Sequence, residues 1–166
     1  MTPRLKRIVE LLPVSDELFD VGCDHGFLTA KLLETVPNLT LLASDVSAPS
    51  LEKARRLLGA RGLSERANIT VADGLSAVDR PVDAVMILGM GAGTILKIVS
   101  EGRDKIGGAA LIVQANVDLP LLRGGLAAKG YAWDLTEGEP ILNKEGGWQM
   151  APVSKVYKRL LNGAED

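Results

Sequence analysis

The residues from Asp20 to Gly26 read Asp-Val-Gly-Cys-Asp-His-Gly, and they place polar side chains between two glycines. Gly22 permits a tight turn, and Gly26 lets a following helix pack close to the preceding strand. Asp45 lies 25 positions after Asp20, at the tip of the next apolar run. A carboxylate at that place can accept hydrogen bonds from both hydroxyls of a ribose. This spacing predicts a site for a cofactor that contains a nucleoside.

Two such cofactors make different demands on the first turn. The dinucleotide fingerprint requires glycine at its third and sixth places, and counting from Gly22 these places hold Asp24 and Phe27. Asp24 would also bring a carboxylate close to a pyrophosphate. S-adenosylmethionine has no phosphate and carries a sulfonium cation, so an acidic turn favours it. An NAD-dependent oxidoreductase remains the less favoured alternative, since the chain also has no Tyr-x-x-x-Lys pair for a proton relay.

Small or polar residues follow each further apolar run. Asp73-Gly74 follows residues 69–71, Gly89-Met90-Gly91 follows residues 82–88, and Asn116 comes shortly after residues 109–113. Asp73 is placed to accept a hydrogen bond from an adenine amine. Each feature also has a purely structural interpretation, as a turn, a strand-to-helix connection or, for Asp45, a strand-end cap.

Two residues of the first turn are open to the same structural interpretation. Cys23 is interpreted as a small loop filler, because no base partner for a nucleophile is recognisable. His25 can be a helix-start residue without a catalytic part.

The apolar pattern predicts strands that alternate with helices. Short apolar runs predict strands at 18–21, 39–43, 69–71, 82–88 and 109–113, and residues 131–135 and 148–153 are expected to form a closing antiparallel pair. Helices are expected after Thr2-Pro3, over 28–33, after Ser47, over 95–99 and over 118–129. Such alternation indicates an α/β, Rossmann-like fold with a mostly parallel, seven-stranded sheet and helices on both faces.

Length and composition bound the class of protein. The chain has 166 residues, 46% of them hydrophobic, which fits one domain over 1–154 with a short tail over 155–166. The net charge of -2 argues against a strongly basic nucleic-acid module. No apolar run reaches the roughly 18 residues of a membrane helix, and charge comes too early for a secretory signal. One cysteine cannot bind a metal by itself. We therefore expect a soluble, cytoplasmic protein without a metal.

Read together, four motifs resemble the bacterial tRNA (adenine-22-N1)-methyltransferase family. They are DVGCDHGFL (20–28), VADGL (71–75), ILGMGAGTI (87–95) and VQANVDLPLLRGGLAAKGY (113–131). The resemblance covers about residues 4–153 and implies a class I methyltransferase fold, S-adenosylmethionine as donor, and N1 of an adenine in the tRNA D-arm as acceptor. A domain of this type that binds the cofactor without independent activity, as a regulator or with a partner, is the alternative.

The resemblance also implies roles for individual residues. The methionine end of the cofactor would lie against Gly22, Cys23, Asp24, His25 and Gly26. Asp45 and Val46 would hold its ribose, Asp73 and Gly74 its adenine, and Gly89 and Met90 would border the acceptor. As catalytic residues we expect Asn116, which would orient the target base, and Asp24, which would act electrostatically.

The chain departs from the family pattern at three places. Asp45 stands where the family usually has glutamate, and Ala115 where it has proline. The family's C-terminal helical domain, thought to help grip tRNA, has no counterpart within the 166 residues.

An RNA substrate would also use aromatic and basic side chains. Extrusion of a base usually needs an aromatic platform, for which the candidates are Phe27, Trp133, Trp148 and Tyr157, whereas Phe19 is expected in the core. Basic residues that could contact phosphates are Arg4, Lys6, Arg7, Arg123, Lys155, Lys158 and Arg159. For the N-terminal group, a merely solvated helix face is the competing interpretation.

Overall fold

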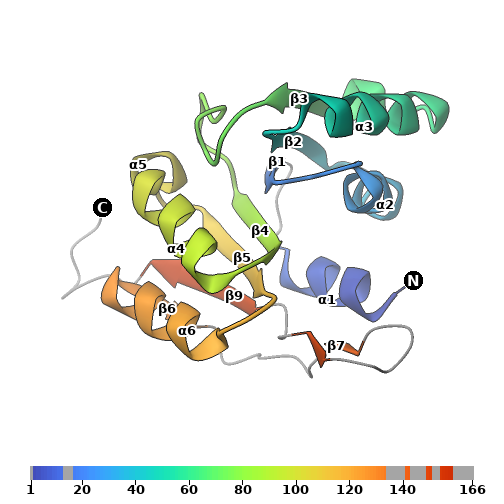
Figure 1. Ribbon diagram of the computed structural model, residues 1–166. Coiled ribbons are helices and arrows are strands. Elements are labelled where there is room, and N and C mark those ends of the chain that lie inside the picture. The colour runs from blue at the N-terminus through green and yellow to red at the C-terminus, as the bar shows by residue number, and fades with distance from the viewer. Residues whose placement is uncertain (1, 13–16, 134–140, 143–148, 151–153, 159–166) are drawn as a thin grey trace.

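A computed structural model describes residues 2–12, 17–133, 141–142, 149–150 and 154–158 of the chain (Figure 1). Its main sheet has the strand order β3-β2-β1-β4-β5-β9-β6. The strands from β3 to β5 are parallel, whereas β9 pairs antiparallel with both β5 and β6. The predicted α/β class with a parallel sheet is confirmed.

The elements follow the chain in a regular alternation. The strands are β1 (Glu17–Val21), β2 (Thr40–Asp45), β3 (Ala67–Val71), β4 (Ala84–Met90), β5 (Ala110–Ala115), β6 (Tyr131–Trp133) and β9 (Ser154–Lys158), with β7 (Ile141–Leu142) and β8 (Gln149–Met150) forming a separate pair. The helices are α1 (Pro3–Leu11), α2 (Phe27–Thr35), α3 (Ala48–Ala60), α4 (Ala92–Glu101), α5 (Arg103–Ile106) and α6 (Leu119–Ala128), and a 3-10 turn, η1 (Ser64–Arg66), precedes β3.

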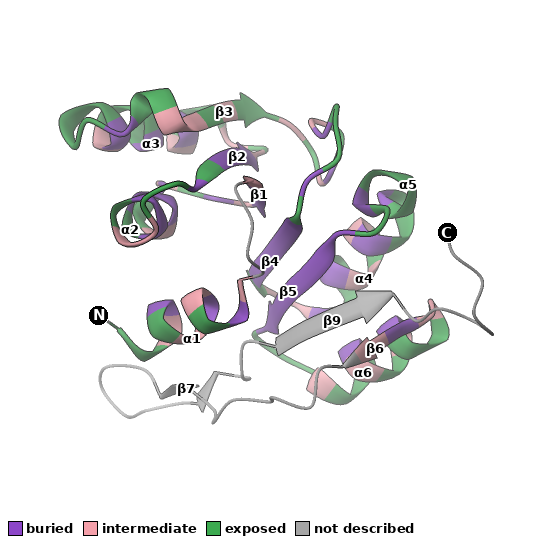
Figure 2. Cartoon of the chain, turned by 180° about the vertical axis from the view of Figure 1, so that it is seen from behind, coloured by how far each residue is buried: buried purple, intermediate pink, exposed green. Residues whose placement is uncertain are grey.

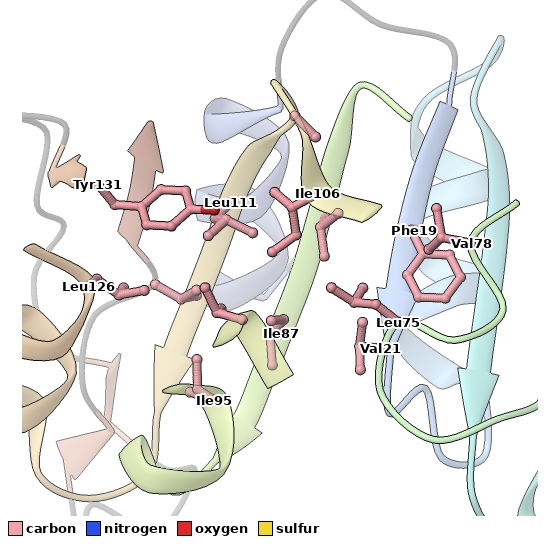
Figure 3. Packing of buried hydrophobic residues seen from close by; sticks show 14 of the residues in the cluster. Phe19, Val21, Leu75, Val78, Ile87, Ile95, Ile106, Leu111, Leu126 and Tyr131 are labelled. Carbon is pink, nitrogen blue, oxygen red and sulfur yellow. The ribbon is translucent and has the colours of Figure 1, made fainter. Parts of the chain in front are cut away.

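Helices cover both faces of the sheet, and each face has its own core (Figure 2). Successive strand residues point to opposite faces, so that Phe19 packs towards α4, α5 and α6 while Leu18 packs towards α1, α2 and α3. Figure 3 shows the first of these cores, in which Ile95 of α4 and Leu126 of α6 lie against the strands. Buried apolar strands of this kind explain why the strands could be predicted from the sequence.

Side-chain caps fix where several helices begin. The Thr2 hydroxyl accepts a hydrogen bond from the Leu5 amide at 3.2 Å, and the Ser47 hydroxyl accepts one from the Ser50 amide at 3.3 Å. Asp118 caps α6 in the same way. Both Thr2 and Ser47 precede a proline in the first turn of the helix. Proline is common at this position, because its fixed φ suits a helix start. The predicted starts of α1 and α3 are confirmed.

The closing strands differ from the expectation. The antiparallel partner of β6 is β9 at 154–158, not the predicted segment 148–153, of which 149–150 pairs with β7 instead. Consequently β9 crosses the expected boundary between domain and tail at residue 154. The short helix α5 was also not predicted. Within the described residues, no helix is long and apolar enough to cross a membrane.

Candidate functional site

A cleft lies where the strand order reverses, between the carboxyl ends of β1 and β4. β1 pairs with β2 on one side and β4 on the other, so the two following connections leave in opposite directions, which is where open α/β sheets bind ligands. The cleft has a volume of about 290 Å³. Its lining residues come from α1, β1, β4 and the turn after β1: Arg4, Asp20, Gly22, Cys23, Asp24, His25, Phe27, Leu28, Leu88 and Gly89.

The turn after β1 is held in shape by its glycines and by β2. Gly22 and Gly26 have φ angles of 74° and 76°, a conformation that side chains rarely adopt. The amides of Gly22 and Cys23 both donate to the carbonyl of Ser44, at 2.8 and 2.9 Å. A Cβ on Gly22 would overlap the Met90 methyl group. The tight turn predicted at Gly22 is confirmed. At Gly26 the close neighbour is Ala54 of α3, not the preceding strand that the sequence analysis expected.

Asp45 connects the first turn to the end of β2. One of its carboxylate oxygens accepts from the Asp24 amide at 3.0 Å, and the other accepts from the Ser47 amide at 2.9 Å. Asp24 has a φ of 51°, unusual for a residue with a side chain. The Asp45 carboxylate is only half-buried, so it is fixed in direction while its remaining lone pairs are accessible to a ligand.

Carboxylates outnumber permanent cations in the lining of this cleft, with the buried Asp20 and the exposed Asp24 against Arg4. Burial raises the pKa of Asp20 to about 6, against opposing effects of the hydrogen bond from the Thr29 hydroxyl (3.0 Å) and of the charge on Arg4. Burial, aided by the charges of Asp20 and Asp45, raises the pKa of the Cys23 thiol to about 12. Cys23 is therefore protonated at neutral pH, in accord with its interpretation as a loop filler. An acidic environment favours a cationic ligand over a pyrophosphate.

On the other side of the cleft, β4 and β5 are joined through side-chain amides. The Asn116 side chain donates to the Gly89 carbonyl at 2.7 Å, and the Asn116 backbone amide donates to the Met90 carbonyl at 2.8 Å. The buried Gln114 side chain accepts from the Gly89 amide at 3.1 Å and donates to Asn116 Oδ1 at 3.4 Å. Asn116 is nevertheless exposed, so this network presents it at the open edge of the site.

The remaining predicted residues lie nearby but not in the same cleft. Asp73 and Gly74 line a neighbouring cleft between the end of β3 and α4. A long hydrogen bond joins Gly74 to β2: the Ser44 hydroxyl donates to the Gly74 carbonyl at 3.5 Å. Val46, directly after β2, is 69% exposed. These residues are available to a ligand that extends from the first turn along the carboxyl ends of β2 and β3.

Two charged residues of the cleft, Asp20 and Arg4, are not among the site residues that the sequence predicts. The sequence pattern assigns Asp20 no role in the site and places Arg4 towards solvent or RNA, whereas both line the cleft. The buried, polar Asp20 in an otherwise apolar strand was the available signal. No sequence signal placed Arg4, because its position depends on how α1 docks against the sheet.

One candidate aromatic platform can be described. Phe27 is 63% exposed, and its ring meets that of His25 edge-on at 6.3 Å between centroids. Phe19 is fully buried as expected. The side chains of Trp133, Trp148 and Tyr157 lie outside the described residues. The described part of the chain holds no cluster of three or more His, Cys, Asp or Glu side chains able to bind a metal.

A family model described as a methyltransferase domain matches residues 1–148. The tRNA (adenine(22)-N(1))-methyltransferase of Bacillus subtilis is 28% identical over 168 residues, covering 100% of this chain and 66% of that protein. A Mycoplasma genitalium relative is 27% identical and is covered over 63% of its length. The chain thus spans just under two thirds of the length of these relatives.

Solved structures are similar over nearly the whole chain. The crystal structure of the B. subtilis tRNA methyltransferase TrmK has a TM-score of 0.81 and 26% identity, covering 95% of this chain and 66% of that one. Streptococcus pneumoniae Sp1610 in complex with S-adenosyl-L-methionine has a TM-score of 0.83 and 27% identity, covering 99% of this chain and 76% of that one.

Proposed function

Because the chain belongs to the methyltransferase-domain family, we propose that it transfers a methyl group from S-adenosylmethionine to N1 of an adenine in the D-arm of a tRNA. The observation that carries this proposal is the acidic turn after β1, tied to Asp45, in a chain similar over its full length to a tRNA (adenine(22)-N(1))-methyltransferase. The similarity to Sp1610 bound to S-adenosyl-L-methionine supports the choice of cofactor.

The described residues fit this cofactor better than they fit NAD. β1 and the turn after it supply the carboxylates of Asp20 and Asp24, which suit an ammonium and a sulfonium. Asp45 supplies a fixed acceptor for ribose hydroxyls. Asp73 and Gly74 extend the site along β3 for the adenine. When bound, S-adenosylmethionine supplies a methyl group on a positively charged sulfur, which the lone pair of adenine N1 can attack without a general base.

The chain's own residues then act mainly by alignment. Holding two reactants in the correct orientation can lower the activation free energy of a reaction by about 7–11 kcal/mol. Asn116 orients the target base from the edge of the site, where the carbonyls of Gly89 and Met90 hold it. The methylated base carries positive charge, and the exposed Asp24 carboxylate stabilises that charge electrostatically.

The acceptor requires an accessible pairing edge. N1 lies on the Watson–Crick edge of adenine, so an adenine in a folded arm must be extruded before it can react. Phe27 offers an exposed aromatic surface beside the cleft for stacking.

Two measurements test the proposal in sequence. Calorimetric titration should show binding of S-adenosylhomocysteine and no binding of NAD; the reverse preference would contradict the cofactor assignment. Incubation of an unmodified tRNA transcript with methyl-labelled donor should then label the RNA. A protein that binds S-adenosylhomocysteine but labels no tRNA would instead be a cofactor-binding domain without independent activity, which is the alternative function.

A further inference from the structure

A groove between α1 and α2 adjoins the cleft described above. The two helices lie on the same face of the sheet (Figures 1 and 2). The groove has a volume of about 340 Å³. Its lining residues, which define the α1–α2 groove, are Thr2, Arg4, Leu5, Phe27, Leu28 and Lys31. Arg4, Phe27 and Leu28 also line the cleft, so the groove and the cleft share one wall.

The α1–α2 groove and the cleft differ in charge. The carboxylates of Asp20 and Asp24 line the cleft, whereas no carboxylate is among the described residues that line the groove. The charged side chains of the groove are Arg4 and Lys31, both cations. Arg4 Nε is buried and makes no hydrogen bond within the described part of the chain. The groove therefore favours an anion, directly beside a cleft that favours a neutral or cationic group.

Lys31 is the cation that lines the groove but not the cleft. It follows Phe27 by four positions on α2, so the two side chains lie on the same face of the helix. Lys31 Nζ lies 3.2 Å from Glu34 Oε2, and the Lys31 side chain is 57% exposed. Because an exposed ion pair of this kind contributes little to stability, Lys31 can exchange Glu34 for a phosphate at low cost.

The α1–α2 groove also offers apolar surface. Phe27 is 63% exposed at the wall shared with the cleft, and the buried Leu5 and half-buried Leu28 complete the apolar lining. Proteins hold single-stranded nucleic acid by this combination, with bases on aromatic rings and phosphates on cations. The groove volume lies near the lower end of the roughly 300–1,000 Å³ of small-ligand sites, which suits one nucleotide unit rather than a double helix.

We propose that the α1–α2 groove binds the sugar-phosphate backbone beside the target adenine, with Lys31 contacting a phosphate. This inference rests on the proposed function, because it assumes that the adenine reacts in the cleft. An extruded nucleotide has a neutral base and an anionic backbone. Its two parts therefore match the cleft and the groove in charge, and Phe27 lies where base and backbone meet. The groove thus favours an RNA strand as substrate over a free adenine nucleoside.

Lys31→Gln tests the inference, because it removes the charge and keeps a polar side chain. Fluorescence anisotropy at about 50 mM salt should show that it weakens tRNA binding about 3- to 10-fold, whereas Lys31→Arg should retain the affinity. The slope of log affinity against log salt should become shallower by about 0.7–1, the loss of one phosphate contact. Calorimetry should show an affinity for S-adenosylhomocysteine within about twofold of the unmodified value, because Lys31 does not line the cleft.

Lys97→Gln is the matched control. Lys97 is exposed on α4, on the opposite face of the sheet, and its replacement makes the same change in net charge. Its affinity for tRNA should stay within about twofold of the unmodified value. An equal loss in both variants would mean that net charge, not the groove, attracts the RNA, and this result would overturn the inference.

The remaining outcomes separate the inference from the function on which it rests. An unchanged tRNA affinity and salt slope for Lys31→Gln would mean that Lys31 is only a solvated helix residue. A parallel loss of affinity for S-adenosylhomocysteine would mean that Lys31 supports the fold. Either result overturns the inference and leaves the proposed function standing. If the unmodified protein binds S-adenosylhomocysteine but neither binds nor methylates tRNA, the proposed function itself fails, and the inference fails with it.

Discussion

Asp20 is a buried carboxyl group for which the effect of burial outweighs the opposing charge of Arg4. Burial raises its pKa to about 6, well above the ordinary value of a carboxyl group. The folded state holds the proton more tightly than the unfolded state does. The contribution of Asp20 to stability is therefore complete below about pH 4 and is lost as the pH rises to about 6.

Asp20→Asn should remove this pH dependence. Asparagine can still accept the hydrogen bond from the Thr29 hydroxyl. As the pH rises from about 4 to about 7.5, the free energy of unfolding of the variant should increase by about 1–3 kcal/mol relative to that of the unmodified protein. Urea denaturation at several pH values measures this gain. The exposed control Asp79→Asn should give a curve parallel to the unmodified one; a parallel curve for Asp20→Asn would contradict the argument.

Asn116 is the residue whose proposed role separates turnover from binding. Asn116→Ala should lower turnover about 100-fold, because the target base loses a positioned amide. It should leave affinity for S-adenosylhomocysteine within about threefold, since the side chain contacts Gly89 rather than the turn after β1. Rate assays and calorimetry check the two quantities, with Asn68→Ala on exposed β3 as the control. Equal losses in both quantities would rule out the role.

At the scale of elements, Gly26 determines how closely α2 and α3 approach. A Cβ at this position would lie 2.8 Å from Ala54 Cβ and 3.2 Å from Ala54 Cα. Gly62 has a similar φ of 68°, but a Cβ there would meet no atom within 4 Å. An alanine at either position would therefore be strained by the positive φ, but only at Gly26 would it also meet a neighbouring side chain.

Gly26→Ala should consequently destabilise the protein more than Gly62→Ala does. The strain common to both should cost about 1–2 kcal/mol, and overpacking against α3 should add about 1–3 kcal/mol for Gly26→Ala alone. The free energy of unfolding from denaturant titration measures the difference. If the two variants lost the same free energy of unfolding, overpacking between α2 and α3 would not contribute to the loss, which would contradict the prediction.

The elements also show which parts of the fold a sequence can predict. The strands β1, β2, β4 and β5 are short, largely buried runs, and Thr2 and Ser47 are local capping signals, so the sequence predicts them well. The partner of β6 was misplaced because pairing between distant segments leaves no local pattern. The same limit applies to the site. The glycines and Asp45 could be predicted from spacing, whereas the position of Arg4 results from tertiary packing.

At the scale of the whole molecule, a net charge of -2 means that any contact with RNA must be local. Protein–RNA affinity falls with salt in proportion to the number of phosphates neutralised. We therefore expect tRNA binding to weaken measurably between about 50 and 200 mM salt. Filter binding or fluorescence anisotropy measures this dependence, with S-adenosylhomocysteine affinity as the internal control. A flat response of tRNA affinity would count against phosphate contacts.

The central claim is that this domain methylates N1 of an adenine in a tRNA, and nucleoside mapping by mass spectrometry tests it most directly. An unmodified tRNA is incubated with methyl-labelled S-adenosylmethionine, digested and mapped. The proposal predicts labelled N1-methyladenosine at one position in the D-arm, and much less of it with Asn116→Ala. Label on another base or another atom, or no label from a protein saturated with the donor, would contradict the claim.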